Sequence, residues 1–359
     1  MVQRLRSAAV FLAAATASAV LAAPAQAATP APVTVVASGF DDPTGLSSWA
    51  GRFYVAESST GEISGFLPGA RPYTRLNQIP GVAGVDRKFD TFYFVTGESD
   101  DPAVKGASTL YSTVTGKPRR KIADLKAYEL ANNPDGQLQF GPDGAPLDAL
   151  SNPFAVLTGR GFDNRVFVAD GGGNDVLVVG PDGKVSTFFA PPVVTTGACA
   201  GRPNNDPQHT GCDPVPTGLA WGPDGNLYVS TLSGEAPGQG RVYVLDPFGG
   251  KVLGTLTGFT SPTGVAVGDD GSVYVSELLE GAPAGDGPPP AGFDPSTVGR
   301  IVKVDRKGVR TVAQVTMPLA LRVVDGQLYS TAWSVAGMFG FGARLGQVVR
   351  VDASAFTRL

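Results

Sequence analysis

The sequence is poor in the residues on which most hydrolytic active sites depend. Its 359 residues include one histidine, His209, and two cysteines, Cys199 and Cys212. It contains no Gly-x-Ser-x-Gly elbow, no Gly-x-x-x-x-Gly-Lys-Ser/Thr phosphate loop and no His-Glu-x-x-His zinc motif. A Ser-His-Asp or Cys-His mechanism would have to use His209. The composition therefore favours carboxylates and amides as functional groups.

Excess positive charge and long apolar runs are also scarce. The chain has 28 basic and 32 acidic residues and no basic stripe, so we expect no nucleic-acid partner. After the first thirty residues, no segment is long and apolar enough to cross a bilayer, and none reads as a long amphipathic helix. What the chain has instead is 48 glycines, 30 prolines and 42% hydrophobic residues, which indicates many turns around a large core.

The N-terminal segment has the features of a secretory signal peptide. Arg4 and Arg6 precede an apolar stretch from Ala8 to Ala23, and Ala25-Gln26-Ala27 has the small-x-small form of a cleavage site. We expect cleavage of residues 1–27 and a secreted or extracytoplasmic protein without a membrane span. The mature chain would carry 26 basic and 32 acidic residues, a net charge of −6. An uncleaved anchor is the alternative.

A repeated strand–turn–strand pattern is the strongest structural signal. The segments 216–230 and 262–276 match almost position for position: each begins Pro-Thr-Gly, passes an Asp-Gly turn and ends Tyr-Val-Ser. A period of roughly 40–50 residues that is rich in short strands is typical of a β-propeller. A β-sandwich with regularly spaced strands is the alternative, but it explains the periodicity less well.

Six copies of this pattern are found in the sequence. The four weaker copies begin near Pro43, Val82, Pro153 and Pro318. The last copy lacks a fourth strand, and residues 33–37 can supply it. We therefore predict an all-β fold: a six-bladed β-propeller closed by the N-terminal strand, with residues 28–359 as a single, monomeric domain. Closure would remove the exposed edges of an open sheet.

The two cysteines lie close together in a Gly-, Pro- and Asn-rich loop, 190–215. In an exported protein such a pair most simply forms a disulfide, so we predict a Cys199–Cys212 bond. A metal site that includes His209 is the alternative, but it lacks a convincing fourth ligand.

Carboxylates follow the second strand of three copies, at Glu57, Asp170 and Glu277. Because equivalent positions face the same end of the ring, these side chains could converge at the channel mouth. Alternatively, each carboxylate binds turn N–H groups within its own blade.

The least repetitive segment, residues 128–153, is an insertion between the second and third copies. It is rich in Asn and Asp, including Asp135, Asp148 and Asn152, and loops on rigid scaffolds often carry function. With the turn at 170–175, it suggests a site for Ca²⁺ or a polyhydroxylated ligand. The predicted ligand-binding residues are Glu129, Asn132, Asn133, Asp170, Asn174 and Asp175. An ordinary surface excursion is the alternative.

These segments also resemble a known family. Tyr128-Glu129, Asn132-Asn133-Pro134-Asp135-Gly136, Ser151-Asn152-Pro153 and Val168-Ala169-Asp170-Gly171-Gly172-Gly173-Asn174-Asp175 are similar to the hallmark segments of the ScyD/ScyE family of exported bacterial propellers. The chain departs from that pattern at Phe154, where a tyrosine is expected, and at Ala149-Leu150, which separates Asp148 from Ser151. The resemblance implies the propeller fold and no established activity.

A broader resemblance is to NHL-type repeats and gluconolactonase-like propellers, which hold a divalent metal in the channel by Glu, Asn and Asp. This chain has Asp41-Asp42-Pro43 where those proteins begin with Glu-Gly-Pro. Two functions remain open. The first is an accessory module that binds a small molecule, glycan or protein and requires no cofactor. The second is a metal-dependent hydrolase or lactonase of the gluconolactonase type.

Overall fold

The structure is a computed structural model that describes residues 32–99, 101, 103–283 and 290–359. The predicted signal peptide, residues 1–27, lies outside the described residues. Pro32–Leu359 forms one compact unit. No helix in the described part of the chain is long and apolar enough to span a membrane.

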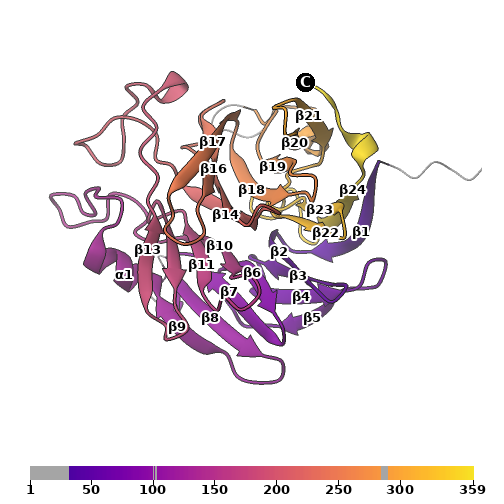
Figure 1. Ribbon diagram of the computed structural model, residues 1–359, viewed down its shortest axis with the longest axis horizontal. Coiled ribbons are helices and arrows are strands. Elements are labelled where there is room, and N and C mark those ends of the chain that lie inside the picture. The colour runs from indigo at the N-terminus through magenta and orange to yellow at the C-terminus, as the bar shows by residue number, and fades with distance from the viewer. Residues whose placement is uncertain (1–31, 100, 102, 284–289) are drawn as a thin grey trace, which may run out of the picture. The chain divides into compact units, whose positions relative to one another are not determined.

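Six antiparallel sheets are arranged in sequence around a central axis, and each is one blade (Figure 1). The prediction of a six-bladed β-propeller is confirmed. Blade 1 is β2 (Pro43–Trp49), β3 (Arg52–Glu57), β4 (Glu62–Phe66) and β5 (Tyr73–Leu76); blade 2 is β6 (Val82–Lys88), β7 (Thr91–Thr96), β8 (Thr109–Val114) and β9 (Arg120–Asp124); blade 3 is β10 (Pro153–Thr158), β11 (Val166–Asp170), β12 (Asp175–Val179) and β13 (Val185–Phe189).

The other half of the ring repeats the same order from the innermost strand outwards. Blade 4 is β14 (Pro216–Trp221), β15 (Leu227–Thr231), β16 (Gly240–Leu245) and β17 (Val252–Phe259); blade 5 is β18 (Pro262–Val267), β19 (Val273–Glu277), β20 (Arg300–Val304) and β21 (Arg310–Gln314), to which β25 (Thr357–Arg358) adds; blade 6 is β22 (Leu321–Val324), β23 (Gln327–Ala332), β24 (Gly346–Val351) and β1 (Val33–Phe40).

The N-terminal strand closes the ring, as predicted. Strand β1 pairs antiparallel with β24, from Val33 opposite Val351 to Phe40 opposite Gly346. Blade 6 is therefore built from both ends of the described chain (Figure 1). This arrangement pairs the edge of β24 that would otherwise be open.

Apolar side chains fill the spaces between blades. One buried cluster combines Tyr228 and Val242 of blade 4 with Val275 and Val302 of blade 5, and comparable clusters lie between the other neighbouring blades. Because each blade is covered on both faces, its inner strands are buried on both sides, whereas outermost strands such as β17 stay largely exposed. The core is therefore a ring of six inter-blade layers.

The glycine of the repeated Pro-Thr-Gly is required by close packing of the innermost strands. A Cβ atom at Gly218 would lie 2.8 Å from Thr263 O, and one at Gly264 would lie 2.1 Å from Leu319 O. Any larger residue would therefore push neighbouring blades apart. This explains why the motif recurs at the start of the strands that line the channel.

One short helix, α1 (Leu125–Asn132), is the main feature that the repeat pattern did not predict. Asp124 caps its N-terminus by accepting a hydrogen bond from Ala127 N at 3.0 Å, and Asn133 ends it in the left-handed conformation, with φ of 45°. Eight residues span about two turns, which is too short for a clear helical periodicity. The helix begins the predicted insertion.

Candidate functional site

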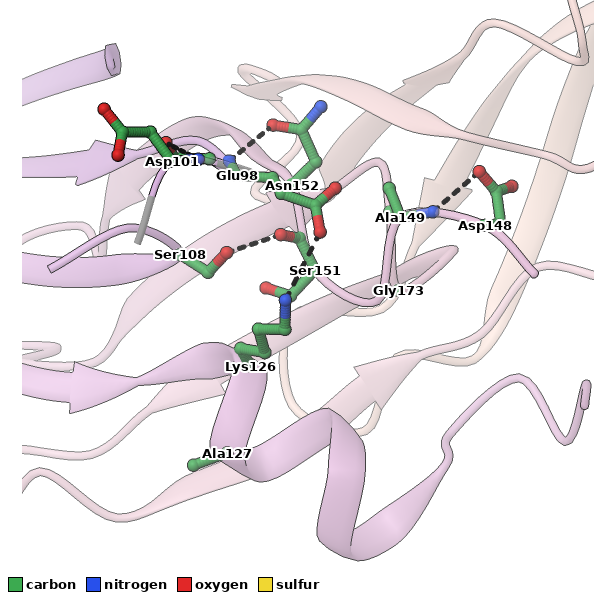
Figure 2. Close-up of polar contacts among 12 residues, drawn as sticks. Glu98, Asp101, Ser108, Lys126, Ala127, Asp148, Ala149, Ser151, Asn152 and Gly173 are labelled. Carbon is green, nitrogen blue, oxygen red and sulfur yellow. Dashed lines mark hydrogen bonds and ion pairs between the residues drawn. The ribbon is translucent and has the colours of Figure 1, made fainter. Parts of the chain in front are cut away.

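The two ends of the insertion are fastened to blade 2. Ser108 Oγ donates a hydrogen bond to Ser151 O at 2.5 Å, and Glu98 N donates to Asn152 Oδ1 at 3.1 Å (Figure 2). At the start of α1, Lys126 Nζ lies 3.4 Å from Glu98 Oε1. These contacts hold the insertion at the end of the ring where the innermost strands begin.

The predicted disulfide is present, between Cys199 and Cys212. Because it occupies both thiols, the alternative of a thiolate metal site with His209 is wrong. The imidazole instead pairs with a carboxylate: His209 Nδ1 lies 2.8 Å from Asp206 Oδ2. Asp206 is itself 2% exposed, and hydrogen bonds from Gln208 N and Leu138 N help to lower its pKa against the opposing effect of burial.

The disulfide loop and the insertion contact each other directly. Leu138 N donates to Asp206 Oδ2 at 3.0 Å, and Gln137 Nε2 donates to Asp213 Oδ1 at 3.0 Å. The connections before and after blade 3 therefore form one irregular layer. The disulfide limits the motion of one half of this layer.

Two of the three strand-end carboxylates bind within their own blades. Glu57 accepts a hydrogen bond from Asp41 N at 2.8 Å, and Glu277 accepts one from Thr260 N at 2.7 Å and pairs with Arg300 Nε at 2.5 Å. In both blades the donor N–H lies just before the innermost strand. These carboxylates fix how the chain enters the blade, which agrees with the structural interpretation and not with convergence on the channel.

Asp170 makes the same kind of contact with more donors. Its carboxylate accepts from Ser151 Oγ and Asn152 N at 2.6 Å, and from Gly172 N and Gly173 N at 3.1 Å. Four donors satisfy a buried carboxylate well, although burial still raises its pKa. Asp170 therefore fixes the turn that presents Asn174 and Asp175.

Three carboxyl groups surround Gly173. A Cβ atom placed on this glycine would lie 3.2 Å from Glu129 Oε2, 3.6 Å from Asp170 Cγ and 3.6 Å from Asp175 Oδ1. Glu129 comes from α1, whereas Asp170 and Asp175 flank the turn between β11 and β12. Residues from the insertion and from blade 3 thus meet at one point, as the sequence predicted for these segments.

Asp175 differs from its neighbours because neither carboxylate oxygen has a hydrogen-bond partner among the described residues. The residue is 1% exposed. Burial, together with the nearby charges of Asp170, Glu129 and Asp135, raises the pKa of Asp175 well above its usual value. Burial also raises the pKa of Glu129, to about 7, against the opposing hydrogen bond from Gln139.

The three predicted asparagines have different environments. Asn174 accepts from Val215 N at 3.2 Å and donates to Asp135 Oδ2 at 3.1 Å, so it connects blade 4 with the insertion. Asn133 donates to Gln137 O, while its own Oδ1 is buried without a partner among the described residues. Asn132 is exposed and donates to a backbone carbonyl of its own helix, so the structure does not bring it into this group. Asp135 joins the group, although it was not among the residues predicted to bind ligand.

A large cavity lies elsewhere, at the opposite end of the channel. It has a volume of about 540 Å³ and is lined by the ends of the innermost strands of all six blades. We call it the channel-mouth cavity and define it by the side chains of Trp49, Asp86, Arg87, Arg160, Trp221 and Arg322. Together with Lys88, four basic residues and one acidic residue line it, in a chain whose net charge is negative.

The floor of this cavity is a buried polar network. Asp86 accepts from Ser47 Oγ at 2.9 Å, from Thr158 N and Oγ1 at 2.9 and 2.8 Å, and from Arg322 Nη2 at 2.8 Å. These partners come from blades 1, 3 and 6. Within the part of the chain that the structure describes, Arg322 donates only through Nη2, so its other N–H groups are available to a ligand.

The rim combines aromatic rings with a basic side chain that is fixed by a hydrogen bond. Trp221 Nε1 donates to Thr158 O at 2.9 Å, which fixes the indole, and Arg160 Nη1 donates to Gly222 O at 2.8 Å while its side chain stays exposed. Trp49 packs edge-on against Phe89, with ring centroids 5.4 Å apart. The rim thus offers flat apolar surfaces beside positive charge.

Two residues of this cavity could have been found from the sequence, although they are not among the predicted site residues. On five inner strands the residue opposite a tyrosine of the second strand is Ser47, Asp86, Ala220, Ala266 or Arg322. Three are small and neutral, whereas Asp86 and Arg322 are charged. A comparison of the repeats position by position would have marked these two residues as departures from the structural pattern.

The channel lacks the donors that a gluconolactonase-type metal site requires. Its narrow part is lined mainly by small and apolar residues such as Gly45, Thr217 and Val265, and none of the described residues that line it is a carboxylate. Asp86 is paired with Arg322. In the residues that the structure describes, no group of three or more His, Cys, Asp or Glu side chains is already arranged to hold a metal ion. The residues present therefore do not fit a channel metal of that type.

Comparison with solved structures shows the fold and no more. A luciferin-regenerating enzyme is similar with a TM-score of 0.57 and 10% identity, over 91% of this chain and 97% of that one. The PQQ-bound aldose sugar dehydrogenase from Streptomyces coelicolor has a TM-score of 0.52 and 15% identity, over 89% and 97%. Virginiamycin B lyase from Staphylococcus aureus has a TM-score of 0.50 and 12% identity, over 91% and 87%.

These neighbours support the propeller fold, and the broader resemblance to NHL- and gluconolactonase-like proteins stays a prediction. No family model and no curated protein matches the sequence. The resemblance to the ScyD/ScyE family therefore stays a prediction. At such low identity, the activities of the neighbours say nothing about the activity of this chain.

Proposed function

We propose that this chain is an exported binding module whose channel-mouth cavity takes a small anionic molecule with an aromatic or other planar apolar part. The observation that carries the proposal is the lining of the 540 Å³ cavity, in which four basic residues face one carboxylate. A volume of this size is typical of small-molecule sites. A glycan or protein would bind here only if it presents such a group.

The charge of the lining favours an anion. Asp86 is 2% exposed and its carboxylate is occupied by four donors, so it offers little to a ligand. The exposed guanidinium of Arg160 and the remaining N–H groups of Arg322 face no such competition. Guanidinium groups bind carboxylate, sulfate and phosphate in bidentate geometry, which makes these anions the best match.

The aromatic residues favour a planar ligand. Trp221 is fixed by its hydrogen bond to Thr158, and Trp49 packs edge-on against Phe89. A fixed indole can stack on a flat ring without further loss of side-chain freedom. Arg87 is unlike Arg160, because it stacks on Tyr54 and Phe92, with 5.0 and 4.8 Å to the ring centroids. We assign Arg87 to shaping the wall.

The competing function, a metal-dependent lactonase, needs carboxylates that face the channel. Glu57 and Glu277 instead bind the backbone of their own blades, and the described residues that line the narrow channel include no acidic residue. No observation on the described residues therefore favours the lactonase over the binding module.

A matched pair of probes tests the proposal. We expect indole-3-carboxylate to bind the mature protein in titration calorimetry, with tryptophan fluorescence as a second readout, and the isosteric indole-3-carboxamide to bind at least about tenfold more weakly, since a hydrogen bond to a charged group contributes about 1.5–3 kcal/mol. Aromatic sulfonates and phosphates extend the series.

The variant Arg160→Gln should weaken the binding of indole-3-carboxylate and leave the binding of indole-3-carboxamide unchanged. Arg344→Gln is the matched control, because Arg344 is an exposed arginine that follows β23, at the other end of the ring. Equal binding of the two probes, or no binding by any aromatic anion in the series, would show that the cavity is not an anion site.

Export is the other part of the proposal. It is supported by the Arg4/Arg6 start, the Ala25-Gln26-Ala27 site and the Cys199–Cys212 disulfide, a bond that persists in oxidising compartments. N-terminal sequencing of the protein recovered outside the cytoplasm should begin at Ala28. Recovery with an intact Met1 would contradict cleavage.

A further inference from the structure

Asp175 is a buried acid without a hydrogen-bond donor in the part of the chain that the structure describes. Both of its oxygens lack a partner, although the residue is 1% exposed. Five residues earlier, Asp170 is equally buried but accepts four hydrogen bonds. An ionised carboxylate in the position of Asp175 is strongly unfavourable unless something else compensates its charge.

No basic side chain in the described residues provides that compensation. The ion pairs of this region join Lys126 to Glu98 and Lys121 to Asp124, and none involves Glu129, Asp170 or Asp175. Asp135 adds a further acidic group whose charge acts on Asp175. Either the acids are protonated, or a cation that the protein takes up balances them.

The geometry around Gly173 has the character of a cation site. The point that a Cβ atom would occupy lies 3.2 Å from Glu129 Oε2 and 3.6 Å from Asp175 Oδ1. The absence of a side chain at residue 173 leaves this point open between the two carboxylates. Small rotations of the Glu129 and Asp175 side chains would bring their oxygens toward one ion.

The ligand atoms available at this point indicate which ion would bind. Every group available here is an oxygen, and a second buried acceptor without a partner, Asn133 Oδ1, belongs to the residue that ends α1. Histidine and thiolate are missing, since His209 pairs with Asp206 and both cysteines form the disulfide. Oxygen-only and strongly acidic surroundings suit Ca²⁺ better than Zn²⁺ or the geometrically stricter Mg²⁺.

We propose that Glu129 and Asp175, with Asp135 beside them, bind one Ca²⁺ next to Gly173, and that this ion fastens the insertion to blade 3. Glu129 and Asp135 belong to the insertion, whereas Asp175 begins β12. The insertion in turn contacts the disulfide loop through Leu138 and Asp206. The ion would therefore order the whole irregular layer at this end of the ring, independently of any ligand in the channel-mouth cavity.

Calorimetry with CaCl₂ on the chelator-treated mature protein tests the site. We expect one ion per chain with a dissociation constant on the order of 10⁻⁴–10⁻³ M, the range of extracellular calcium modules. Ca²⁺ should also raise the melting temperature, and Mg²⁺ should do so less. The variant Asp175→Asn should weaken Ca²⁺ binding at least about tenfold, because it removes a carboxylate whose two oxygens have no partner among the described residues.

Two further variants separate ion binding from folding. Gly173→Ala keeps every charge but places a methyl group at the ion's position, so it should also abolish the calcium response. Asp143→Asn is the matched control: it removes an equal charge from an exposed turn of the same insertion, where the carboxylate accepts only from Ala145 N.

Two results would overturn the proposal. The first is a wild-type protein that shows no heat of binding and no shift in melting temperature at Ca²⁺ concentrations about tenfold above the expected dissociation constant. The second is an Asp175→Asn or Gly173→Ala variant that binds Ca²⁺ like the parent. Either result would show that Glu129 and Asp175 do not bind Ca²⁺ next to Gly173.

Discussion

Arg322 Nη2 donates to Asp86 Oδ1 at 2.8 Å, although 236 residues separate the two in sequence. The pair joins blade 6 to blade 2 across the channel. It replaces, at two of the six equivalent positions, residues that are small or apolar in the other blades. A structural requirement of the repeat does not explain this exchange, whereas a role in the channel-mouth cavity does.

Removal of Arg322 alone should destabilise the folded protein. In Arg322→Ala, Asp86 keeps the donors Ser47 and Thr158 but loses its cation while it stays buried. We expect a loss of about 3 kcal/mol in the free energy of unfolding, the lower end for a buried pair, because the Arg322 side chain is 26% exposed. Urea denaturation measures it.

The double variant Asp86→Ala/Arg322→Ala is the control for that prediction. It removes both charges and leaves alanine at the positions that Ala220 and Ala266 occupy in other blades. We expect it to be more stable than Arg322→Ala. A double variant that is less stable by the full sum of the two single changes would mean that the residues act independently.

Deletion of β1 should open the ring. Without residues 33–40, strand β24 keeps β23 but loses its second partner and presents unpaired backbone groups, and Phe40 no longer fills the layer between blades 6 and 1. We expect aggregation or loss of a single cooperative melting transition. Deletion of residues 357–359, which contain the two-residue strand β25, is the control and should melt nearly as the parent does.

Reduction of the disulfide should destabilise the irregular layer more than the ring. Cys199 and Cys212 are 13 residues apart, and closing a loop of that size contributes about 3 kcal/mol in the chain-entropy model. A Cys199→Ser/Cys212→Ser variant should therefore show faster hydrogen exchange around Leu138 and Asp206. Exchange in β11 and β15 should change little. Equal acceleration throughout would show that the loop supports the whole ring.

The stability of the chelator-treated protein should fall as the pH rises from about 4.5 to about 7. Burial raises the folded-state pKa of Glu129 to about 7 from 4.5, so the folded state binds more protons than the unfolded state between these values. The charged groups that face it are Asp135, Asp170 and Asp175, which are acidic and act in the same direction.

Melting temperatures measured across this pH range test the prediction. Glu129→Gln should flatten the decline, because glutamine does not titrate, whereas Asp143→Asn should leave it unchanged. A parent protein whose stability rises between pH 5 and 7 would contradict the predicted direction for Glu129.

The repeat pattern predicted the architecture because each blade solves the same packing problem with the same residues. Pro-Thr-Gly at the start of an inner strand indicates the close approach of neighbouring blades, and it is visible in a single sequence. The missing fourth strand of the last copy predicted the role of residues 33–37 by simple counting. The disulfide was predicted from two cysteines that lie close together in a chain expected to be exported.

The sites were harder to predict because they depend on contacts between repeats. Asp175 has the sequence context of an ordinary turn residue, and only the covering insertion makes it a buried acid without donors among the described residues. Asp86 and Arg322 meet because the ring closes, which no local pattern encodes. Helix α1 has only eight residues, too few to distinguish its periodicity from that of a polar loop.

The pairing of β1 with β24 also determines when the protein can finish folding. Strand β1 is the first element of the propeller to emerge during synthesis or translocation, and its partner, residues 346–351, is the last strand of that sheet. Blades 1 to 5 can form in order, but the final layer must wait for almost the entire chain. Such late, long-range pairing slows folding. The propeller therefore stays unclosed until its C-terminal part has been synthesised or translocated.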